Sequence, residues 1–324
     1  MTEERDLLRA TVRDLVTKHA TPEAVRRAIE SEHGYDESLW KLLCEQVGAA
    51  ALVVPEDLGG AGGELADAAT VLQELGRALV PTPLLGTILA ELALLAADDV
   101  DADTIAGLAE GTAIGAVVLD PHYVVNGDIA DVIVAVDERS REEHQTRDGQ
   151  LTRWTSVTAE RVDTMDTTRR LARLTAEAAT PLGADPGIAD LAAVLLAAEQ
   201  IGAAERCLEL TVDYTKQRVQ FGRPIGSFQA LKHRMADLYV KVSAARALVD
   251  DAVADPGPTS SALARVAATE AFVAVASEAI QMHGGIAITW EHDIQLYFKR
   301  AHGSAQLLGP ARDYLARLES EVLN

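Results

Sequence analysis

The sequence has little cysteine, few aromatic residues and too few basic residues to balance its acidic ones. Two cysteines, Cys44 and Cys207, stand among 324 residues, and neither lies near another cysteine or a histidine at a metal-ligand spacing. This excludes a disulfide framework and a cysteine-based metal site, so we expect two buried core thiols and no metal. Aromatic residues make up 4%, whereas alanine, leucine and valine supply most of the 48% hydrophobic share. Because alanine and leucine favour helices, the composition predicts a mostly α protein.

Positive charge is scarce, since 29 lysine and arginine residues against 50 aspartate and glutamate residues leave a net charge of −21. Such a surface repels phosphate backbones and anionic lipid, so we expect no nucleic-acid partner and no membrane partner. No uncharged apolar run reaches about 18 residues, and the charged N-terminus lacks the apolar core of a signal peptide. We therefore expect a cytoplasmic protein.

Hydrophobic periodicity divides the chain into three parts. Residues 1–110 carry apolar side chains at helical spacing, which predicts an N-terminal helical domain. Residues 111–182 contain short β-branched runs and predict a small middle β domain, with hairpin turns at Asn126-Gly127 and Asp148-Gly149 and a polar tip at 142–148. Residues 183–324 return to long helices joined by short loops, which is typical of a C-terminal four-helix bundle.

Capping residues mark where individual helices start and stop. Thr21-Pro22 and Asp185-Pro186 each place a capping side chain before a proline, which indicates a helix start. The third long helix of the bundle is expected over about 261–283, ended by Gly284-Gly285.

Two segments of the C-terminal part stand out in the sequence. One is Arg218-Val-Gln-Phe-Gly-Arg-Pro-Ile-Gly-Ser-Phe-Gln-Ala230, and the other is Gln281-Met-His-Gly-Gly-Ile-Ala287. The first resembles the Arg-x-x-Phe-Gly-x-x-(Ile/Leu)-x-x-x-Gln-Ala turn of the acyl-CoA dehydrogenase family, and the second resembles that family's Gln-x-x-Gly-Gly-x-Gly motif. Stretches at 54–60 and 74–78 are similar to its N-terminal domain. The resemblance implies an acyl-CoA dehydrogenase fold, FAD as cofactor and oxidation of an acyl-CoA to its 2,3-enoyl form.

The resemblance also implies which residues bind FAD. From position alone, Arg218 is either a C-terminal helix cap or a guanidinium placed to hold a diphosphate; the resemblance favours the diphosphate. Phe221 and Phe228, core residues in most helix turns, would pack near the diphosphate and ribityl chain. The missing Cβ atoms of Gly284 and Gly285 would allow close approach to the FAD of a neighbouring subunit. The predicted cofactor-binding residues are Arg218, Gln220, Phe221, Ile225, Phe228, Gln281, Gly284 and Gly285.

The reaction also needs a carboxylate that removes the α-proton while hydride leaves the β-carbon. The family places this glutamate at one of two positions, which are occupied here by Leu308 and Ala192. Neither residue can accept a proton. Ala193 replaces an arginine that many members use near CoA, although Asp190 is retained, and the middle domain has no Thr-Glu-Pro-like run followed by Gly-Ser-Asp. We therefore predict that this chain carries no catalytic residue.

Other titratable residues near these positions have simpler interpretations. Glu199 lies two helical turns after Ala192, about 10 Å along the axis, too far to serve the same α-carbon, so we expect a polar residue of the bundle or an interface. Glu291 and Asp293 are expected to cap a helix N-terminus. His283 could face the flavin, but a lone histidine at a helix end favours a structural role.

These observations lead to one leading hypothesis and two alternatives. The leading one is a non-catalytic subunit of a heteromeric acyl-CoA dehydrogenase, an α2β2 heterotetramer of the kind found in actinobacterial sterol catabolism, whose partner subunit supplies the catalytic glutamate. The first alternative is a flavin-dependent monooxygenase or oxidase on the same fold, which needs an open flavin face and no such base. The second is a flavin-free scaffold subunit. A sterol-derived CoA thioester as substrate follows from analogy within the family.

Overall fold

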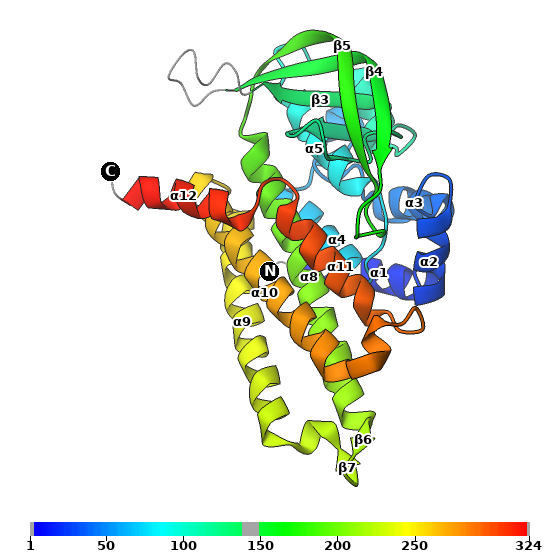
Figure 1. Cartoon of the computed structure of the whole chain (residues 1–324). Coiled ribbons are helices and arrows are strands. Elements are labelled where there is room, and N and C mark those ends of the chain that lie inside the picture. The colour runs from blue at the N-terminus through cyan, green and yellow to red at the C-terminus, as the bar shows by residue number, and fades with distance from the viewer. Residues whose placement is uncertain (1–2, 138–148, 323–324) are drawn as a thin grey trace.

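A computed structural model of the chain describes residues 3–137 and 149–322. Short helices and a small sheet form the upper part of the molecule, and long helices extend below them (Figure 1). The prediction of a mostly α fold with a small β domain is confirmed. The expected polar tip at 142–148 lies outside the described residues.

The N-terminal part consists of helices whose starts follow capping chemistry. They are α1 (Glu3–His19), α2 (Pro22–Glu30), α3 (Glu37–Leu42) with a π-helical turn (Leu43–Val47), α4 (Leu65–Arg77), α5 (Leu84–Leu95) and α6 (Ala102–Ala109). Thr21 accepts a hydrogen bond from the Ala24 amide at 3.3 Å, which confirms the predicted helix start. Most residues of α4 and α5 are buried, and α4 packs against the long helix α8 (Ile188–Gln217). This contact joins the N-terminal helices to the bundle.

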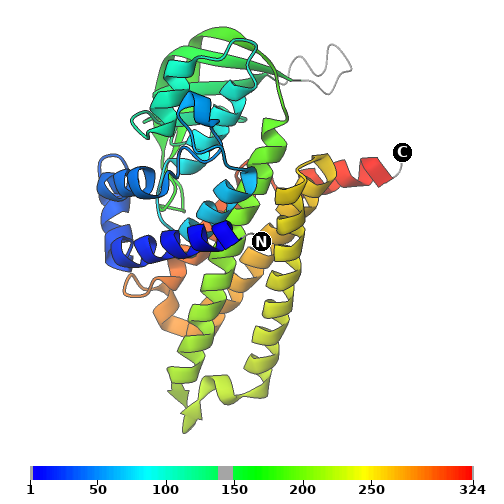
Figure 2. The ribbon, with the colours of Figure 1, turned by 180° about the vertical axis from the view of Figure 1, so that it is seen from behind.

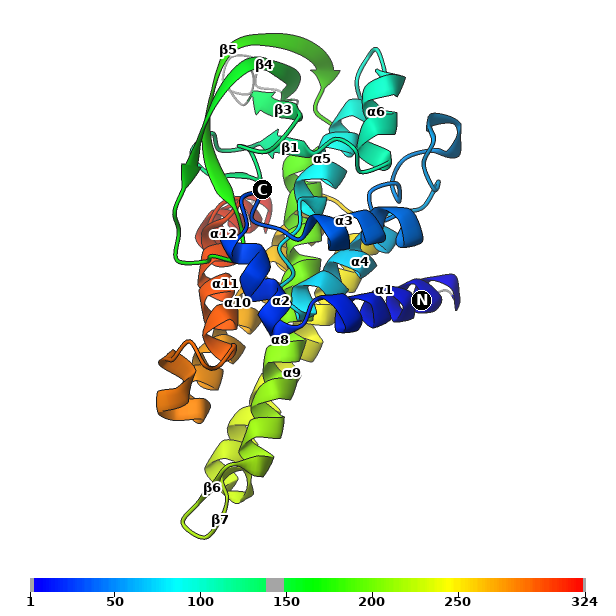
Figure 3. The same ribbon diagram turned by 90° about the vertical axis from the view of Figure 1, so that its right-hand side faces the viewer.

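The middle part is one sheet in the order β1-β3-β4-β5-β2. Its strands are β1 (Gly115–Val118), β2 (Val124–Val125), β3 (Val132–Asp137), β4 (Gln150–Val162) and β5 (Leu171–Ala184). The predicted hairpin at Asn126-Gly127 is wrong, because β2 pairs with β5 while β3 pairs with β1 and β4. Asn126 does turn the chain, with a φ of +55°. The β4–β5 ribbon carries its connection, residues 163–170, down to the helices (Figure 3).

The C-terminal part is built on three long helices. They are α8, α9 (Gln229–Ala254) and α10 (Pro258–His283), followed by α11 (Ile294–Gln306) and α12 (Ala311–Val322). The Asp185 carboxylate accepts from the Gly187 and Ile188 amides, but α8 begins at Ile188 with Gly187 at its N-cap, so the start predicted at Asp185-Pro186 is two residues too early. α10 begins at Pro258, earlier than predicted, because the Gly257 amide donates to the Ser260 hydroxyl and forms a cap there. Seen from behind, the lower halves of α8 and α9 project beyond the N-terminal helices (Figure 2).

The structure shows how the two cysteines and the apolar helix α10 are packed. Both cysteines are free thiols, and burial raises the pKa of the half-buried Cys44 to about 12. Cys207 is fully buried, as expected of a core thiol. The segment 258–288, which contains α10, is long and apolar enough to cross a membrane, but α10 packs against α8, α9 and α11 and buries Arg265 completely. Its apolar character is that of a bundle core helix.

Candidate functional site

The first motif segment forms a tight hairpin at the end of α8. Strands β6 (Val219–Gln220) and β7 (Arg223–Pro224) pair antiparallel, and Phe221 and Gly222 form the turn between them. Both turn residues have positive φ, +53° and +76°, which matches the twist of a two-residue hairpin. A 3₁₀ turn (Ile225–Ser227) then leads into α9. The hairpin lies at the lower tip of the molecule (Figure 1).

The side chain of Phe221 points away from the protein. It is 91% exposed, and its ring meets the Phe228 ring edge-on at 6.2 Å. A bulky residue in the left-handed region is a conformational outlier, so this exposed ring is held at a cost in backbone energy. Phe228 is half-buried, with the Arg223 guanidinium 4.0 Å from its ring centre. Phe221 is therefore not a core residue of this chain, and its predicted contact with FAD stays a prediction.

The backbone of Arg218 is hydrogen-bonded within the protein, whereas its side chain is exposed. Its amide donates to the Tyr214 carbonyl at 2.9 Å, and its carbonyl accepts from the Ile225 amide at 2.8 Å. The guanidinium is exposed and has no side-chain partner within residues 3–137 and 149–322. By contrast, the Gln220 amide donates to the Val219 carbonyl at 2.9 Å. Ile225 is half-buried under the turn.

The second motif segment ends α10 in the 3₁₀ turn η4 (Gly284–Ile288). Gln281 is exposed on the last turn of the helix. Gly284 has φ +65° and ψ −144°, a conformation that essentially only glycine adopts. A Cβ atom added at Gly284 or Gly285 would meet nothing within 4 Å, so the backbone here faces open space. The turn is shaped for close contact with a ligand outside this chain's core.

His283 joins this turn to the first segment. Its ring stacks on Tyr214 at 4.2 Å and lies 4.8 Å from the His292 ring. Its Nδ1 donates to the Ala279 carbonyl at 2.7 Å. Burial lowers the pKa of His283, and nearby His292 lowers it further, so the ring is neutral at pH 7. This contact pattern agrees with the structural role expected of His283.

The two positions that lack a carboxylate differ in burial, because Leu308 is only half-buried. Ala192 is fully buried on α8, as are the residues from 193 to 198 that follow it. Leu308 has a φ of +60° in the loop after α11. Buried Arg265 holds this loop, because its Nη2 donates to the carbonyls of Ser304 and Leu307 at 2.6 and 2.7 Å. Tyr314 donates to the Leu308 carbonyl at 2.6 Å.

Nearby polar residues are committed to ion pairs. Asp190 accepts from Arg317 at 2.7 Å, and Ala193 is packed in a small apolar cluster. Asp293 stands at the start of α11, but its carboxylate pairs with Arg26 at 2.6 Å. His292 caps this helix instead, since its Nδ1 accepts from the Ile294 amide at 3.2 Å. The expectation that Asp293 and the exposed Glu291 cap the helix is therefore wrong.

Glu199 is the centre of a buried ion cluster. Arg169 donates to its carboxylate at 2.5 Å, and Arg300 Nη1 lies 3.5 Å away. Asp166 balances the second guanidinium, with its Oδ2 3.6 Å from Arg300 Nε. Burial alone would raise the pKa of Glu199, but Arg169 and Arg300 hold it below its usual range. Glu199 is thus an ionised structural acceptor of the bundle, as expected, rather than a proton-accepting base.

This cluster also closes the interior between α8, α11 and the connection from β4 to β5. The remaining cavity has a volume of about 20 Å³ and is lined by Glu199, Arg169, Arg300, Thr168 and neighbours. A space of this size holds about one water molecule. An acyl chain does not fit beside Glu199 without displacing the cluster.

Comparison with known proteins gives these elements a family. The family model described as "Acyl-CoA dehydrogenase, N-terminal domain" matches residues 2–112, and the one described as "Acyl-CoA dehydrogenase, C-terminal domain" matches residues 188–311. The chain belongs to the acyl-CoA dehydrogenase family. It is 70% identical to acyl-CoA dehydrogenase IpdE2 of Mycobacterium tuberculosis over 320 residues. The alignment covers 99% of this chain and 98% of that protein.

Solved structures with the acyl-CoA dehydrogenase fold match this chain over almost its whole length. The Tcur3481–Tcur3483 steroid ACAD G363A variant matches with a TM-score of 0.88 and 27% identity, over 99% of this chain and 98% of that chain. A chain of the ChsE4–ChsE5 complex from Mycobacterium tuberculosis matches with a TM-score of 0.87 and 26% identity, over 100% of this chain and 98% of that chain. The suspected family is thereby confirmed.

Acyl-CoA dehydrogenases are FAD-dependent, and the geometry of the two motif segments fits this cofactor. Arg218 offers an uncommitted guanidinium for an anionic diphosphate, and the open backbone at Gly284 and Gly285 admits a ligand closely. The individual roles of the eight predicted cofactor-binding residues stay predictions.

The sequence interpretation missed two features of this site. Gln229 is exposed at the first position of α9, beside the hairpin, and it is the glutamine of the motif that begins at Arg218. The family motif that this segment resembles includes this glutamine, so Gln229 could have been predicted from the sequence. Tyr214, which contacts His283 and also accepts the Arg218 amide, had no signal in the sequence because its partner lies 69 residues away.

Proposed function

We propose that this chain is the non-catalytic subunit of a heteromeric, FAD-dependent acyl-CoA dehydrogenase that desaturates the α,β bond of a CoA thioester. Its partner subunit supplies the catalytic glutamate, and this chain supplies elements that hold FAD. The observation that carries the proposal is the contrast between the two sites. The FAD motifs are open and uncommitted, whereas Ala192 and Leu308 leave the base positions empty of carboxylates and the adjacent interior is closed by Glu199 and its arginines.

Four of the eight predicted cofactor-binding residues would each contribute to FAD binding in this reaction. When bound, FAD accepts the hydride from the β-carbon. Arg218 would neutralise diphosphate charge, and Gln281 would donate a hydrogen bond from the end of α10. Gly284 and Gly285 would bring the backbone close to the cofactor. The α-proton has no acceptor in this chain at the family's positions, so the partner's glutamate would remove it.

A partner is further supported by exposed apolar side chains on the same segments. They are Val219, Phe221, Ile286, Ile288 and Trp290, from 39% to 91% exposed. Exposed apolar clusters on soluble proteins mark interaction surfaces. The structural relatives named above include a ChsE4–ChsE5 complex and a steroid ACAD, which supports a heteromeric partner and a steroid-derived substrate; the arrangement we propose is an α2β2 heterotetramer. An assembly of this kind would work in the cytoplasm.

Co-expression tests the proposal. The chain is purified alone and together with a longer homologue that carries glutamate at a base position, and flavin absorbance and acyl-CoA oxidation are measured for both. We expect activity and bound FAD only in the complex. Replacing the partner's glutamate with glutamine should abolish activity, whereas Glu199→Gln in this chain should leave turnover per folded complex unchanged.

Three outcomes would overturn the proposal. Full dehydrogenase activity with stoichiometric FAD in the lone chain would show that it has its own base. Oxygen uptake by the lone chain with reduced flavin and an aromatic substrate would support the monooxygenase alternative. An active complex whose FAD content does not change when Arg218 is replaced with glutamine would leave this chain as a scaffold.

A further inference from the structure

A cavity far from the base positions lies where the N-terminal helices meet the bundle. Its volume is about 410 Å³, and its walls come from α1, α2, the end of α4, α8 and α11. This volume is in the range of small-molecule sites, which favour junctions between domains. The floor is apolar and consists of Val16, Val25, Leu79, Leu210, Leu296 and Tyr297.

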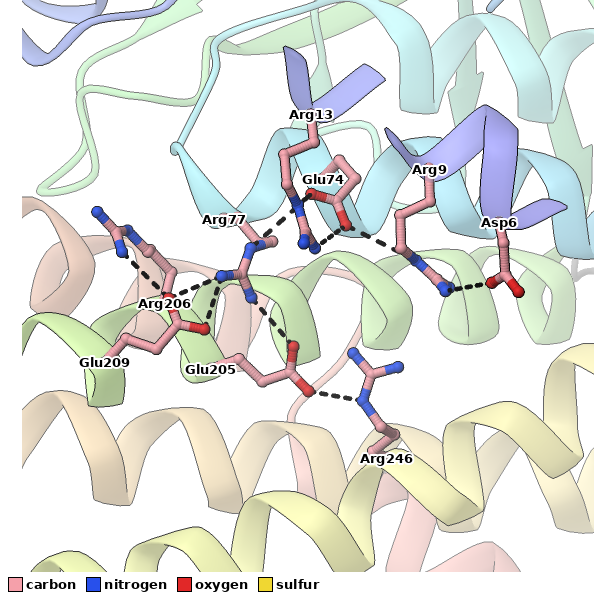
Figure 4. Close-up of polar contacts among 9 residues, drawn as sticks. All are labelled: Asp6, Arg9, Arg13, Glu74, Arg77, Glu205, Arg206, Glu209 and Arg246. Atoms are coloured by element: carbon pink, nitrogen blue, oxygen red, sulfur yellow. Dashed lines mark hydrogen bonds and ion pairs between the residues drawn. The ribbon is translucent and has the colours of Figure 1, made fainter. Parts of the chain in front are cut away.

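Arg13, Arg77 and Arg206 line this cavity, and Figure 4 shows their polar contacts with nearby glutamates. Glu74 is 3% exposed and accepts two hydrogen bonds from Arg13, each at 2.8 Å. Arg9 and Arg77 also approach its carboxylate, at 3.7 and 3.8 Å. One buried carboxylate thus has three arginines around it.

The acidic groups at this cavity are already neutralised. Arg77 pairs with Glu205 at 3.2 Å and Glu209 at 2.7 Å. The other acidic residue of the wall, Asp293, pairs with Arg26 at 2.6 Å.

Two of the wall arginines retain unused donors. Arg206 uses only Nη1, at 3.1 Å from Glu209, and Arg13 uses Nε and Nη2 for Glu74. In the part of the chain that the structure describes, Arg206 Nη2 and Arg13 Nη1 have no hydrogen-bond or ion-pair partner. Both residues line the cavity and are partly exposed, with 52% of the Arg13 side chain and 42% of the Arg206 side chain accessible, in a protein whose net charge is −21. Guanidinium donors without a protein partner, beside apolar cavity residues, complement an anion that carries an apolar chain.

The floor also contains strained backbone. Leu79, which is buried, has a φ of +52° directly after the end of α4. The Tyr297 hydroxyl holds this helix end by donating to the Arg77 carbonyl at 2.5 Å. Bulky residues persist in the left-handed region where the surroundings over-determine them, and such residues concentrate at ligand clamps.

We propose that this cavity binds a small amphipathic carboxylate, a monocarboxylic acid with an apolar chain. The chain lies on the floor around Leu79 and Leu210, and the carboxylate accepts hydrogen bonds from Arg206 and Arg13. Arginine is suited to this contact because hydrogen bonds from a guanidinium to a carboxylate are charge-assisted and stronger than those between neutral groups. The site is independent of the proposed dehydrogenase function, since it shares no residue with the FAD motifs or the base positions.

Calorimetric titration of the full chain with decanoate tests the site, with decanol as the neutral probe of matched chain length. We expect decanoate to bind at least tenfold more tightly than decanol and to weaken as salt is raised, because the charged contact is near solvent. Arg206→Gln should weaken decanoate binding about tenfold. Ala20→Trp, which fills the cavity from the residue after α1, should abolish it. Arg234→Gln, on the exposed face of α9, is the matched control and should have no effect.

The proposal fails if decanoate does not bind up to millimolar concentration, or if decanol binds equally well. It also fails if Arg206→Gln binds like the unaltered chain while circular dichroism shows an intact fold. The titration is repeated on the complex with the partner subunit. Binding that is lost in the complex would mean that the cavity seats a segment of the partner, and would overturn the assignment to a small carboxylate.

Discussion

The Tyr214 hydroxyl donates a hydrogen bond to the carbonyl oxygen of His283 at 3.2 Å, and the two rings stack at 4.2 Å. Tyr214 also accepts the amide of Arg218, one helical turn later, and His283 directly precedes Gly284. The pair therefore links the two FAD motifs, which are more than sixty residues apart in the sequence. Their spacing depends on this contact.

Tyr214→Ala should loosen FAD binding in the assembled enzyme more than tenfold, because both motifs lose their common support. Tyr214→Phe keeps the stack and removes one hydrogen bond worth about 1 kcal/mol, so a smaller, severalfold loss is expected. Flavin fluorescence on dilution measures the release. Tyr239→Phe, 67% exposed on α9, is the control. Unchanged FAD affinity in Tyr214→Ala, with only a lower melting temperature, would reduce the pair to a structural role.

Phe221→Gly should separate stability from cofactor binding. The left-handed backbone at Phe221 costs about 1–2 kcal/mol, and glycine removes that cost while adding freedom to the unfolded chain. We expect the lone chain to be equally stable or about 1 kcal/mol more stable, and the complex to retain less FAD. Phe221→Asn, which tolerates the same backbone, should behave alike. Urea unfolding and flavin absorbance measure the two effects, and a destabilised lone chain would contradict the strain argument.

Glu199→Gln should cost about 3–5 kcal/mol at pH 7, because it leaves Arg169 and Arg300 buried with too little negative charge. The arginines lower the pKa of Glu199 in the folded state, so its stabilising effect is present above the unfolded carboxyl pKa. That effect is lost as the pH falls through the folded pKa. The difference between Glu199→Gln and the unaltered chain should therefore shrink in acid. Denaturant unfolding from pH 3 to 7 measures it, and a constant difference would refute the ionised cluster.

Glu91→Gln should stabilise the protein. Glu91 is fully buried on α5, neither carboxylate oxygen has a hydrogen-bond partner among the described residues, and burial raises its pKa to about 9. The folded state holds a proton that the unfolded state releases above about pH 4.3, so stability falls as the pH rises from there to about 9. Glutamine removes this penalty, on the order of 3 kcal/mol at pH 7.

Thermal unfolding from pH 5 to 9 measures the effect of Glu91→Gln. The melting temperature of the unaltered chain should fall across this range, and that of Glu91→Gln should be higher and flatter. Glu110→Gln, on the exposed end of α6, is the matched control and should follow the unaltered chain. Parallel curves for Glu91→Gln and the unaltered chain would show that Glu91 is ionised in the fold.

Much of the fold was predictable because its signals are local. Thr21 caps α2 through an amide three residues away, Asp185 accepts from amides two and three residues on, just before α8, and the sharp change in periodicity marks the sheet. The hairpin predicted at Asn126-Gly127 failed because a turn signal does not specify which strands pair. Here β2 and β3 follow each other in the chain but are not neighbours in the sheet, whose order is β1-β3-β4-β5-β2. Asp293 failed as a cap because Arg26, 267 residues away, takes its carboxylate.

The site shows the same division. The FAD motifs and the absence of a glutamate at Leu308 and Ala192 are matters of residue identity, so the mostly α fold follows from the sequence, and the proposal of an incomplete active site in a chain short of basic and aromatic residues rests on it. The closed interior depends on Arg169, Glu199 and Arg300 meeting at one point, and the larger cavity is lined by residues as distant in the chain as Arg13 and Arg206. Such contacts join residues distant in the chain, and only the packing of helices against the sheet brings their charges within a few ångströms.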